Sequence, residues 1–89
     1  MKEVVFRPGF LKNWKRLEKK HYNKQELLGV IQMLKDDEYI SAKYHDHALS
    51  GNYKGYRECH IRSNWLLIYK STETEVTLIA TGTHDDLFK

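Results

Sequence analysis

The stretch YRECHIRSNWLLIYKSTETEVTLIATG, residues 56–82, decides the fold. Polar and apolar side chains alternate in its first part, which is typical of a half-buried strand, and hydrophobic residues dominate its middle. Short turns separate three strand-like segments: residues 56–62, 65–69 and 75–81. Because connections this short cannot form crossovers, the stretch predicts an antiparallel three-stranded meander.

A short strand and two helices are predicted upstream of this meander. Residues 2–7 have strand character, and Pro8 suits the first turn of a helix. That helix would carry an apolar stripe opposite a basic face, the stripe consisting of Phe10, Leu11, Trp14 and Leu17. Asn23 followed by Glu26 indicates the start of a second helix, which we expect to end near Lys35. Its apolar residues at helical spacing are Leu27, Leu28, Val30, Ile31 and Leu34.

The segment between the helices and the meander, residues 38–55, is polar and predicted to be a loop, with Gly51 and Gly55 bracketing a turn. The order of elements is therefore one strand, two helices and a meander. This order predicts an α+β fold, in which a helical hairpin packs on a small sheet. We expect one domain over residues 1–89, because the chain is short and carries no linker or repeat.

The charge of the chain is asymmetric. Residues 1–24 contain eight Lys or Arg against two Asp or Glu, a balance of +6, whereas the whole chain carries +3. The basic segment fits a polyanionic or acidic protein partner, and it fits a solvated helix face equally well. The single Cys59 excludes an internal disulfide, and no apolar run approaches the ~20 residues of a membrane span. We expect a cytoplasmic protein with no membrane partner.

Histidines are the strongest chemical signal in the second half. His60 lies on a predicted strand, His47 precedes the glycine turn, and His84 follows the last strand. Histidine titrates near neutrality, so two of them can serve as general base and general acid. Transesterification of RNA needs one group to remove the 2′-OH proton, another to protonate the 5′-oxygen, and a cation for the charged phosphorane. This chemistry requires no metal or other cofactor.

Other interpretations stay open at this point. A histidine taken singly is typical of a surface or hydrogen-bonded position. A metal site is conceivable, although the chain lacks the paired CxxC or HxxxH spacings that indicate zinc; its ligands would be drawn from His45, His47, Cys59, His60 and His84. The basic first helix and exposed aromatic residues also fit RNA binding without chemistry.

Three motifs, read in order, resemble a known family: DHALSGNYKGYRECHI (46–61), NWLLIYK (64–70) and TGTHDDLF (81–88). They are similar to the YafQ branch of the RelE superfamily, the toxins of bacterial type II toxin–antitoxin pairs. The resemblance covers nearly the whole chain and implies a RelE-like fold. It implies an endoribonuclease toxin, an mRNA interferase that enters the ribosomal A site, cuts the codon there by 2′-OH attack, and is held inactive by an antitoxin.

The implied partners are a cognate antitoxin protein, mRNA on the 70S ribosome, and ribosomal RNA. The functional positions of the family fall here on His47, His60, Asn64, Trp65, Ala80, His84 and Phe88. By this resemblance the three histidines share the acid–base and phosphate-orienting roles. Phe88 would stack on or position a base, and Trp65 would shape the same wall. A RelE-fold protein that binds an antitoxin or RNA without cleavage is the alternative.

Two positions depart from the family pattern. Asn64 stands where many relatives carry an acid, and asparagine cannot take a proton at neutral pH. Ala80 stands where arginine is usual, and loss of one charge-stabilising group typically lowers the rate by about 10²–10³. Arg57 and Lys54 are candidate RNA-binding cations that would substitute for it. The sequence leaves open whether the chain is fully active, attenuated or inactive.

Overall fold

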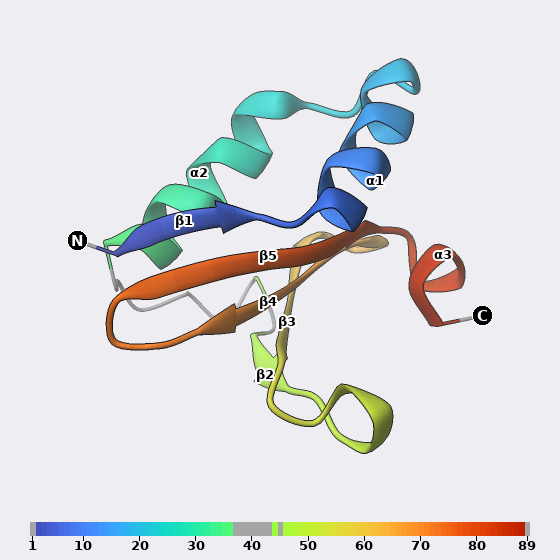
Figure 1. The fold of residues 1–89 in the computed structure, drawn as a ribbon. Coiled ribbons are helices and arrows are strands. Elements are labelled where there is room, and N and C mark those ends of the chain that lie inside the picture. Colours follow the sequence, from blue (N-terminus) through green and yellow to red (C-terminus); the bar gives the residue numbers. More distant parts are fainter. Residues whose placement is uncertain (1, 37–43, 45, 89) are drawn as a thin grey trace.

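The computed structural model describes residues 2–36, 44 and 46–88, which form a five-stranded sheet with two helices on one side (Figure 1). A third, shorter helix lies beyond the end of the last strand. The elements in chain order are β1 (Glu3–Phe6), α1 (Pro8–Lys19), α2 (Lys24–Lys35), β2 (His47–Ala48), the 3-10 turn η2 (Gly51–Tyr53), β3 (Arg57–Arg62), β4 (Trp65–Ser71), β5 (Glu75–Gly82) and α3 (His84–Phe88). No helix in the described part of the chain is long and apolar enough to cross a membrane.

The predicted meander forms the centre of the sheet. The strand order is β1-β5-β4-β3-β2, with β3, β4 and β5 antiparallel as expected. β1 pairs with β5 in parallel, so the first strand of the chain lies beside the last. The prediction of a loop over residues 38–55 was wrong for His47–Ala48, which pair with Glu58 and Arg57 and add an edge strand. Two residues are too few to produce a recognisable alternation, so only the pairing partner reveals this strand.

Both predicted helices are confirmed. Pro8 opens α1, and the side-chain oxygen of Asn23 caps α2 by accepting hydrogen bonds from the backbone N–H groups of Gln25 (2.8 Å) and Glu26 (3.2 Å). The predicted apolar stripes were partly wrong, because Leu11 and Leu28 remain 48% and 42% exposed. Both leucines lie at the margin of their stripe, where a helix that packs on a sheet turns toward solvent.

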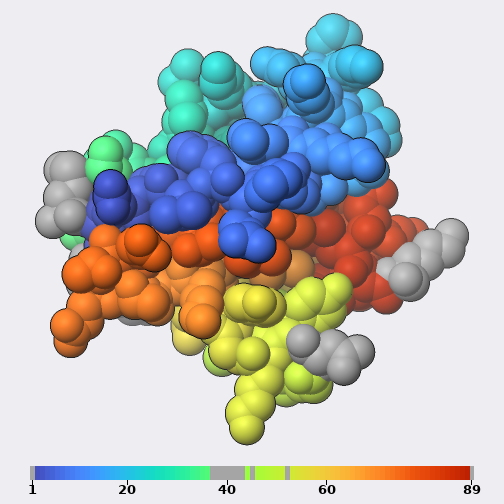
Figure 2. Space-filling view, viewed as in Figure 1, coloured from blue at the N-terminus to red at the C-terminus, as the bar shows by residue number. Residues whose placement is uncertain are grey.

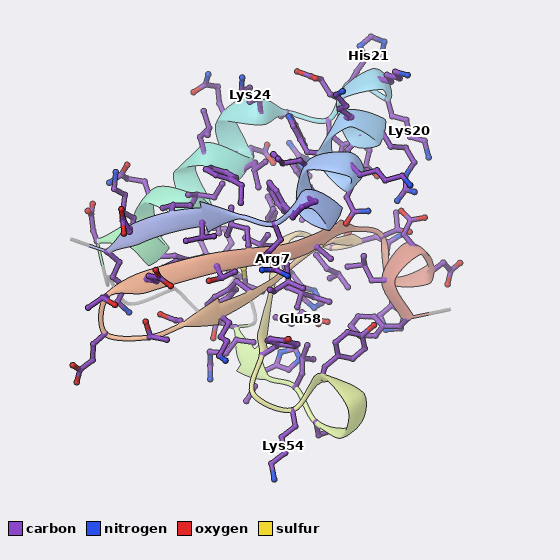
Figure 3. All side chains as sticks on the ribbon, in the orientation of Figure 1. Arg7, Lys20, His21, Lys24, Lys54 and Glu58 are labelled. Carbon is purple, nitrogen blue, oxygen red and sulfur yellow. The ribbon has the colours of Figure 1, made fainter. Side chains whose placement is uncertain are left out.

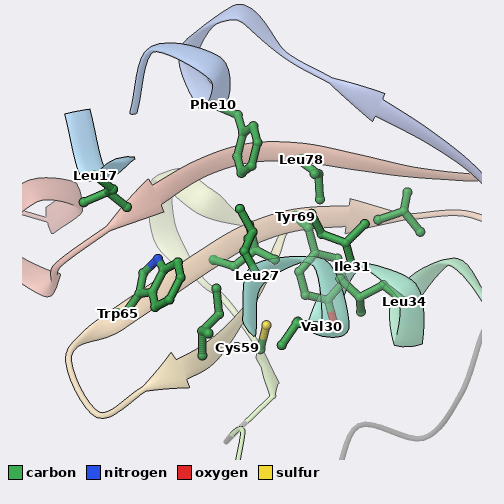
Figure 4. Close-up of a cluster of buried hydrophobic side chains, with 13 residues drawn as sticks. Phe10, Leu17, Leu27, Val30, Ile31, Leu34, Cys59, Trp65, Tyr69 and Leu78 are labelled. Carbon is green, nitrogen blue, oxygen red and sulfur yellow. The ribbon is translucent and has the colours of Figure 1, made fainter. Parts of the chain in front are cut away.

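The hydrophobic core lies between the helix pair and the sheet (Figure 4). Leu17 of α1 and Val30 of α2 pack there with Cys59, Tyr69 and Leu78 from the three central strands. Cys59 is fully buried, and this burial raises the pKa of its thiol to about 12. The thiol therefore serves as a small core residue and is held in its unreactive, protonated form.

The opposite side of the sheet, which we call the open face, has a different set of side chains. Because side chains alternate along a strand, Glu58 and His60 lie on the side opposite Cys59. Leu66 and Ile68 lie on this face of β4, and Ala80 lies on it in β5, opposite Ile68. The polar side chains of the central strands that point away from the helices therefore share one surface.

The C-terminal segment is a short helix, which the sequence did not predict. Thr83 and Asp86 cap its start reciprocally: the Thr83 N–H donates to Asp86 Oδ2 (3.0 Å), and the Asp86 N–H donates to Thr83 Oγ1 (3.1 Å). Gly82 suits the position beside this cap, because a Cβ there would lie 3.0 Å from Asp86 Oδ2 and would require the Asp86 side chain to shift. The glycine thus lets the chain leave β5 directly into α3.

Candidate active site

A carboxylate placed between two histidines is the main feature of the open face. Glu58 Oε1 lies 3.2 Å from His60 Nε2 and 3.4 Å from His47 Nε2. The side chain of Glu58 is 6% exposed, whereas those of His60 and His47 are 27% and 51% exposed. A nearly buried carboxylate therefore contacts two imidazoles that are partly exposed.

Strand pairing explains how these three residues meet. His47 stands directly opposite Glu58 in the antiparallel β2–β3 pair, and His60 follows Glu58 two residues later on the same face. Pairing within the sheet alone therefore brings these three side chains together. Figure 3 shows Glu58 on the side of β4 and β5 away from the helices.

Ala80 belongs to the same row of side chains across the sheet. His47 pairs with Glu58, Glu58 with Ile68, and Ile68 with Ala80. Adjacent strands are about 4.8 Å apart, so Ala80 is about 10 Å from Glu58, with Ile68 between them. The position where an arginine was expected thus lies on the same face and in the same row as the glutamate–histidine cluster of Glu58, His47 and His60. The alanine leaves that part of the row without charge.

His84 lies at one end of the open face, at the start of α3. Its backbone N–H donates to Asn64 Oδ1 (3.2 Å) in the turn between β3 and β4. Asn64 therefore connects the β-turn to the helix that carries His84. This contact gives Asn64 a positioning role that needs an oxygen acceptor and no titratable proton.

Asp86 also stabilises the start of α3. Its carboxylate lies 3.6 Å from Arg16 of α1, in addition to the hydrogen bonds that it exchanges with Thr83. The backbone N–H of Thr83 is the main reason that the pKa of Asp86 is lowered from its usual value. The charged form of Asp86 is thus the one that anchors α3.

Aromatic contacts join α3 to the η2 turn. The Phe88 ring lies 5.1 Å from the His84 ring and 5.4 Å from the Tyr53 ring, the latter edge-on at 77°. The Tyr53 hydroxyl also donates to the Leu87 carbonyl oxygen (3.3 Å). Phe88 therefore contacts both the ring of His84 and the ring of Tyr53.

Trp65 occupies a different place from the one expected. It is 2% exposed and lies on the helix face, where its ring stacks on Trp14 (6.3 Å, 10°) and meets Tyr22 edge-on (5.0 Å). Its Nε1–H donates to Thr81 Oγ1 (2.9 Å). Trp65 is therefore a core residue, and a side chain this buried would act on RNA through its neighbours.

Arg57 and Lys54 also lie away from the glutamate–histidine cluster. Arg57 pairs with Tyr69 in register, which places it on the helix face, and its guanidinium donates to Asp46. That hydrogen bond is the main cause of the raised pKa of Arg57. Lys54 follows η2 and extends away from the sheet in Figure 3. Neither cation replaces the missing charge of position 80 in this arrangement.

Sequence reasoning missed several residues of the site. Glu58 is the most important, and the signal was present: the spacing Glu58-x-His60 on a predicted strand places both side chains on one face. Tyr53 lies in the segment predicted as a loop, where no periodicity indicates which way a side chain points. Asp46 lies in the same segment, but its partners Arg57 and Tyr69 are on the helix face and not at the site. Asp46 accepts hydrogen bonds from both Arg57 and Tyr69, so it joins the β2 edge to the core.

The metal interpretation draws no support from the arrangement of the described residues. Among them, no group of three or more His, Cys, Asp or Glu side chains is arranged to hold a metal ion. His45, one of the candidate ligands, lies outside the described residues.

Comparison with known proteins gives consistent matches along the whole chain. The family model described as a bacterial toxin of type II toxin–antitoxin system, YafQ, matches residues 2–89. The mRNA interferase toxin YafQ of Escherichia coli K12 is 33% identical over 88 residues, which are 98% of this chain and 96% of that protein.

Solved structures agree with these sequence matches. The copper-bound mutant toxin from Helicobacter pylori has a TM-score of 0.94 at 32% identity, covering 99% of this chain and 100% of that one. A chain of the E. coli DinJ–YafQ toxin–antitoxin complex has a TM-score of 0.92 at 32% identity, covering 99% of this chain and 98% of its own. The expected RelE-like α+β fold is thus confirmed.

Proposed function

The chain belongs to the YafQ family of type II toxin–antitoxin toxins, and from this membership we propose that it is an endoribonuclease that cleaves mRNA and is neutralised by a cognate antitoxin. The relatives named mRNA interferase toxin and the DinJ–YafQ complex support both parts of this proposal. The observation that carries it is the placement of Glu58 Oε1 within 3.4 Å of both His47 and His60.

The proposed reaction is an internal transesterification of RNA. The 2′-oxygen forms a bond to phosphorus, the bond from phosphorus to the 5′-oxygen breaks, and a 2′,3′-cyclic phosphate results. One imidazole takes the 2′-OH proton and another gives a proton to the 5′-oxygen. Glu58 would orient His47 and His60 and stabilise whichever of them is protonated, as a carboxylate does beside a catalytic histidine.

His84 and Phe88 would complete the site at the α3 end. Phe88 is held by Tyr53 and lies beside His84, so a base stacked on Phe88 would bring its phosphate near that histidine. We propose the ribosomal A site as the place of cleavage, with mRNA on the 70S ribosome as substrate and the cytoplasm as location. The basic face of α1 would contact ribosomal RNA through its phosphates.

One observation favours a second candidate function. The row that contains Glu58 ends in Ala80, so the cation expected for the transition state has no counterpart at that position. A RelE-fold protein that binds antitoxin or RNA without cleavage would tolerate this alanine. A nuclease with reduced activity would tolerate the alanine as well.

Induction of the chain in bacteria, with and without its antitoxin, tests the proposal. Primer extension on ribosome-bound mRNA should show cuts in A-site codons, and co-expression of the antitoxin should remove them. His60→Ala should abolish the cuts, whereas His21→Asn, in the turn between α1 and α2, should not. Asparagine suits that control because His21 has a φ of +65°, a conformation that asparagine accepts.

The outcome that would overturn the proposal is the lack of cleavage in both the natural chain and its Ala80→Arg variant. Cleavage by the variant alone would identify an attenuated nuclease. Antitoxin binding without any cleavage by either form would establish the non-catalytic function.

A further inference from the structure

A groove runs along the open face beside the proposed active site. It has a volume of about 590 Å³ and is lined by residues that include Arg7, Tyr56, Lys70, Thr77 and Ile79. In Figure 2 the blue N-terminal surface, the orange surface of β5 and the yellow surface near the start of β3 meet on this side of the molecule. The groove therefore unites parts of the chain that are distant in sequence.

The groove lies one row along the sheet from the glutamate–histidine cluster. Lys70 pairs with Thr77, and Ile68 pairs with Ala80, so Lys70 lies two residues along β4 from the Glu58 row. Two residues of strand span about 7 Å. Ile79, which lines the groove, is the neighbour of Ala80. An extended ligand in the groove would thus reach the cluster without leaving the sheet.

The charge and the ring chemistry of the groove favour a nucleic acid. Arg7 and Lys70 supply positive charge, and none of the residues that line the groove is acidic. Neither cation has a carboxylate partner among the ion pairs of the described residues. Tyr56 directly precedes β3 and is partly exposed. Cations that track a backbone beside an aromatic ring are the usual means of binding single strands.

The Arg7 side chain makes no ion pair among those found in the described part of the chain. It occupies the N-cap position of α1, but its side chain makes no capping hydrogen bond. Its backbone N–H donates to the Leu78 carbonyl oxygen (3.2 Å), which any residue except proline could do. In Figure 3 the Arg7 side chain lies over β5. The guanidinium is therefore available for a ligand on the open face.

We propose that this groove binds the single-stranded RNA that adjoins the scissile phosphate, with Arg7 and Lys70 contacting phosphates and Tyr56 stacking on a base. The proposal rests on the proposed nuclease function and extends it to a substrate-binding subsite. The subsite would contribute to substrate affinity and not to the chemical step, because the groove lies one row away from the glutamate–histidine cluster. Loss of these side chains should raise KM and leave the single-turnover rate at saturation nearly unchanged.

Binding of a labelled eight-nucleotide 2′-O-methyl RNA, followed by fluorescence anisotropy at several salt concentrations, tests the subsite without cleavage. Arg7→Ala and Lys70→Ala should each weaken binding and reduce the slope of log K against log salt by about 0.7. Tyr56→Ala should weaken binding about 5- to 150-fold, whereas Tyr56→Phe should retain the affinity. Lys24→Ala, which removes a similar charge at the start of α2, is the matched control.

Three results would overturn the subsite. One is unchanged RNA affinity and unchanged KM in the Arg7→Ala, Lys70→Ala double variant with its melting temperature preserved. Another is an equal loss of affinity in Lys24→Ala, which would indicate general charge attraction. The third is loss of antitoxin affinity with RNA affinity intact, which would assign the groove to an acidic peptide. Groove-dependent RNA binding in a chain that cuts no mRNA would leave the subsite standing and refute only the proposed cleavage.

Discussion

Ala80 lies in the same cross-strand row as Glu58, on the same face of the sheet, with only Ile68 between them. An arginine side chain at position 80 would extend over Ile68 toward the carboxylate and the histidines. Ala80 is partly exposed, whereas Ile68 is 1% exposed. This relationship gives the expected role of residue 80 a geometric basis.

Ala80→Arg should therefore increase mRNA cleavage by about 10²–10³, because it supplies a charge that stabilises the phosphorane. Single-turnover cleavage and growth arrest on induction measure the effect. Ala80→Met adds similar bulk without charge and should leave the rate unchanged. Equal rates for the natural chain and the arginine variant would show that residue 80 does not face the reacting phosphate.

Glu58→Gln should lower the cleavage rate by at least about 10²-fold, because the neutral amide no longer stabilises a protonated histidine. The comparison is best made in the Ala80→Arg background, where activity is highest. Glu75→Gln, at the exposed start of β5, removes a carboxylate of the same type and should have no effect. A full rate with glutamine at position 58 would reduce Glu58 to a packing role.

Asn64→Ala should reduce cleavage by up to about 10²-fold, because it removes the acceptor of the His84 N–H and loosens the start of α3. Asn64→Asp keeps an oxygen acceptor and should retain the activity. Ser63→Ala, in the same turn, is the matched control. If the alanine and aspartate variants lose activity equally, the hydrogen bond to His84 is not what residue 64 contributes.

Trp65→Ala should lower the free energy of unfolding by about 3–5 kcal/mol, as expected for a large aromatic residue in a core. Trp65→Phe should cost less, and the Thr81 hydroxyl keeps a partner because it also donates to the Leu66 carbonyl oxygen (2.7 Å). Urea unfolding measures both. Weaker RNA binding by Trp65→Phe at unchanged stability would restore the RNA-contacting role and refute the core role.

Asp86→Asn should destabilise the protein at pH 7, by about 0.5–1 kcal/mol as for other lost helix caps. The pKa of Asp86 is lowered in the folded state, so its contribution is present above the unfolded pKa, about 3.9, and is lost as the pH falls through the folded value. The stability difference between the two proteins should accordingly shrink between pH 5 and pH 3. A difference that is constant with pH would exclude the charged cap.

The sequence predicted the elements that have a clear period or a distinctive end. Pro8 and Asn23 marked the helix starts correctly, and the alternation from Tyr56 onward predicted the meander. Leu11 and Leu28 were misassigned, because helical spacing identifies a stripe but not how wide the facing sheet is. The parallel pairing of β1 with β5 has no local signature at all.

The site was harder to predict than the fold. A histidine is a candidate site residue wherever it occurs in a sequence. Glu58 looks like any other carboxylate on a strand, and only its pairing with His47 distinguishes it. Trp65 shows the converse difficulty: a position singled out by family resemblance is buried and stacks on Trp14. Which face of the sheet a residue occupies decides its role, and that face depends on register and bulges that no single segment reveals.

The pairing of β1 with β5 also orders events during synthesis. Residues 3–6 leave the ribosome long before residues 75–78, their partners in the sheet, and α1 packs on the same late strand. Closing so long a loop is slow, and the early segments have no sheet to join until it happens. The nascent chain therefore stays incomplete until β5 has been translated, and the same strand leads into His84, so the fold and the proposed site are finished together.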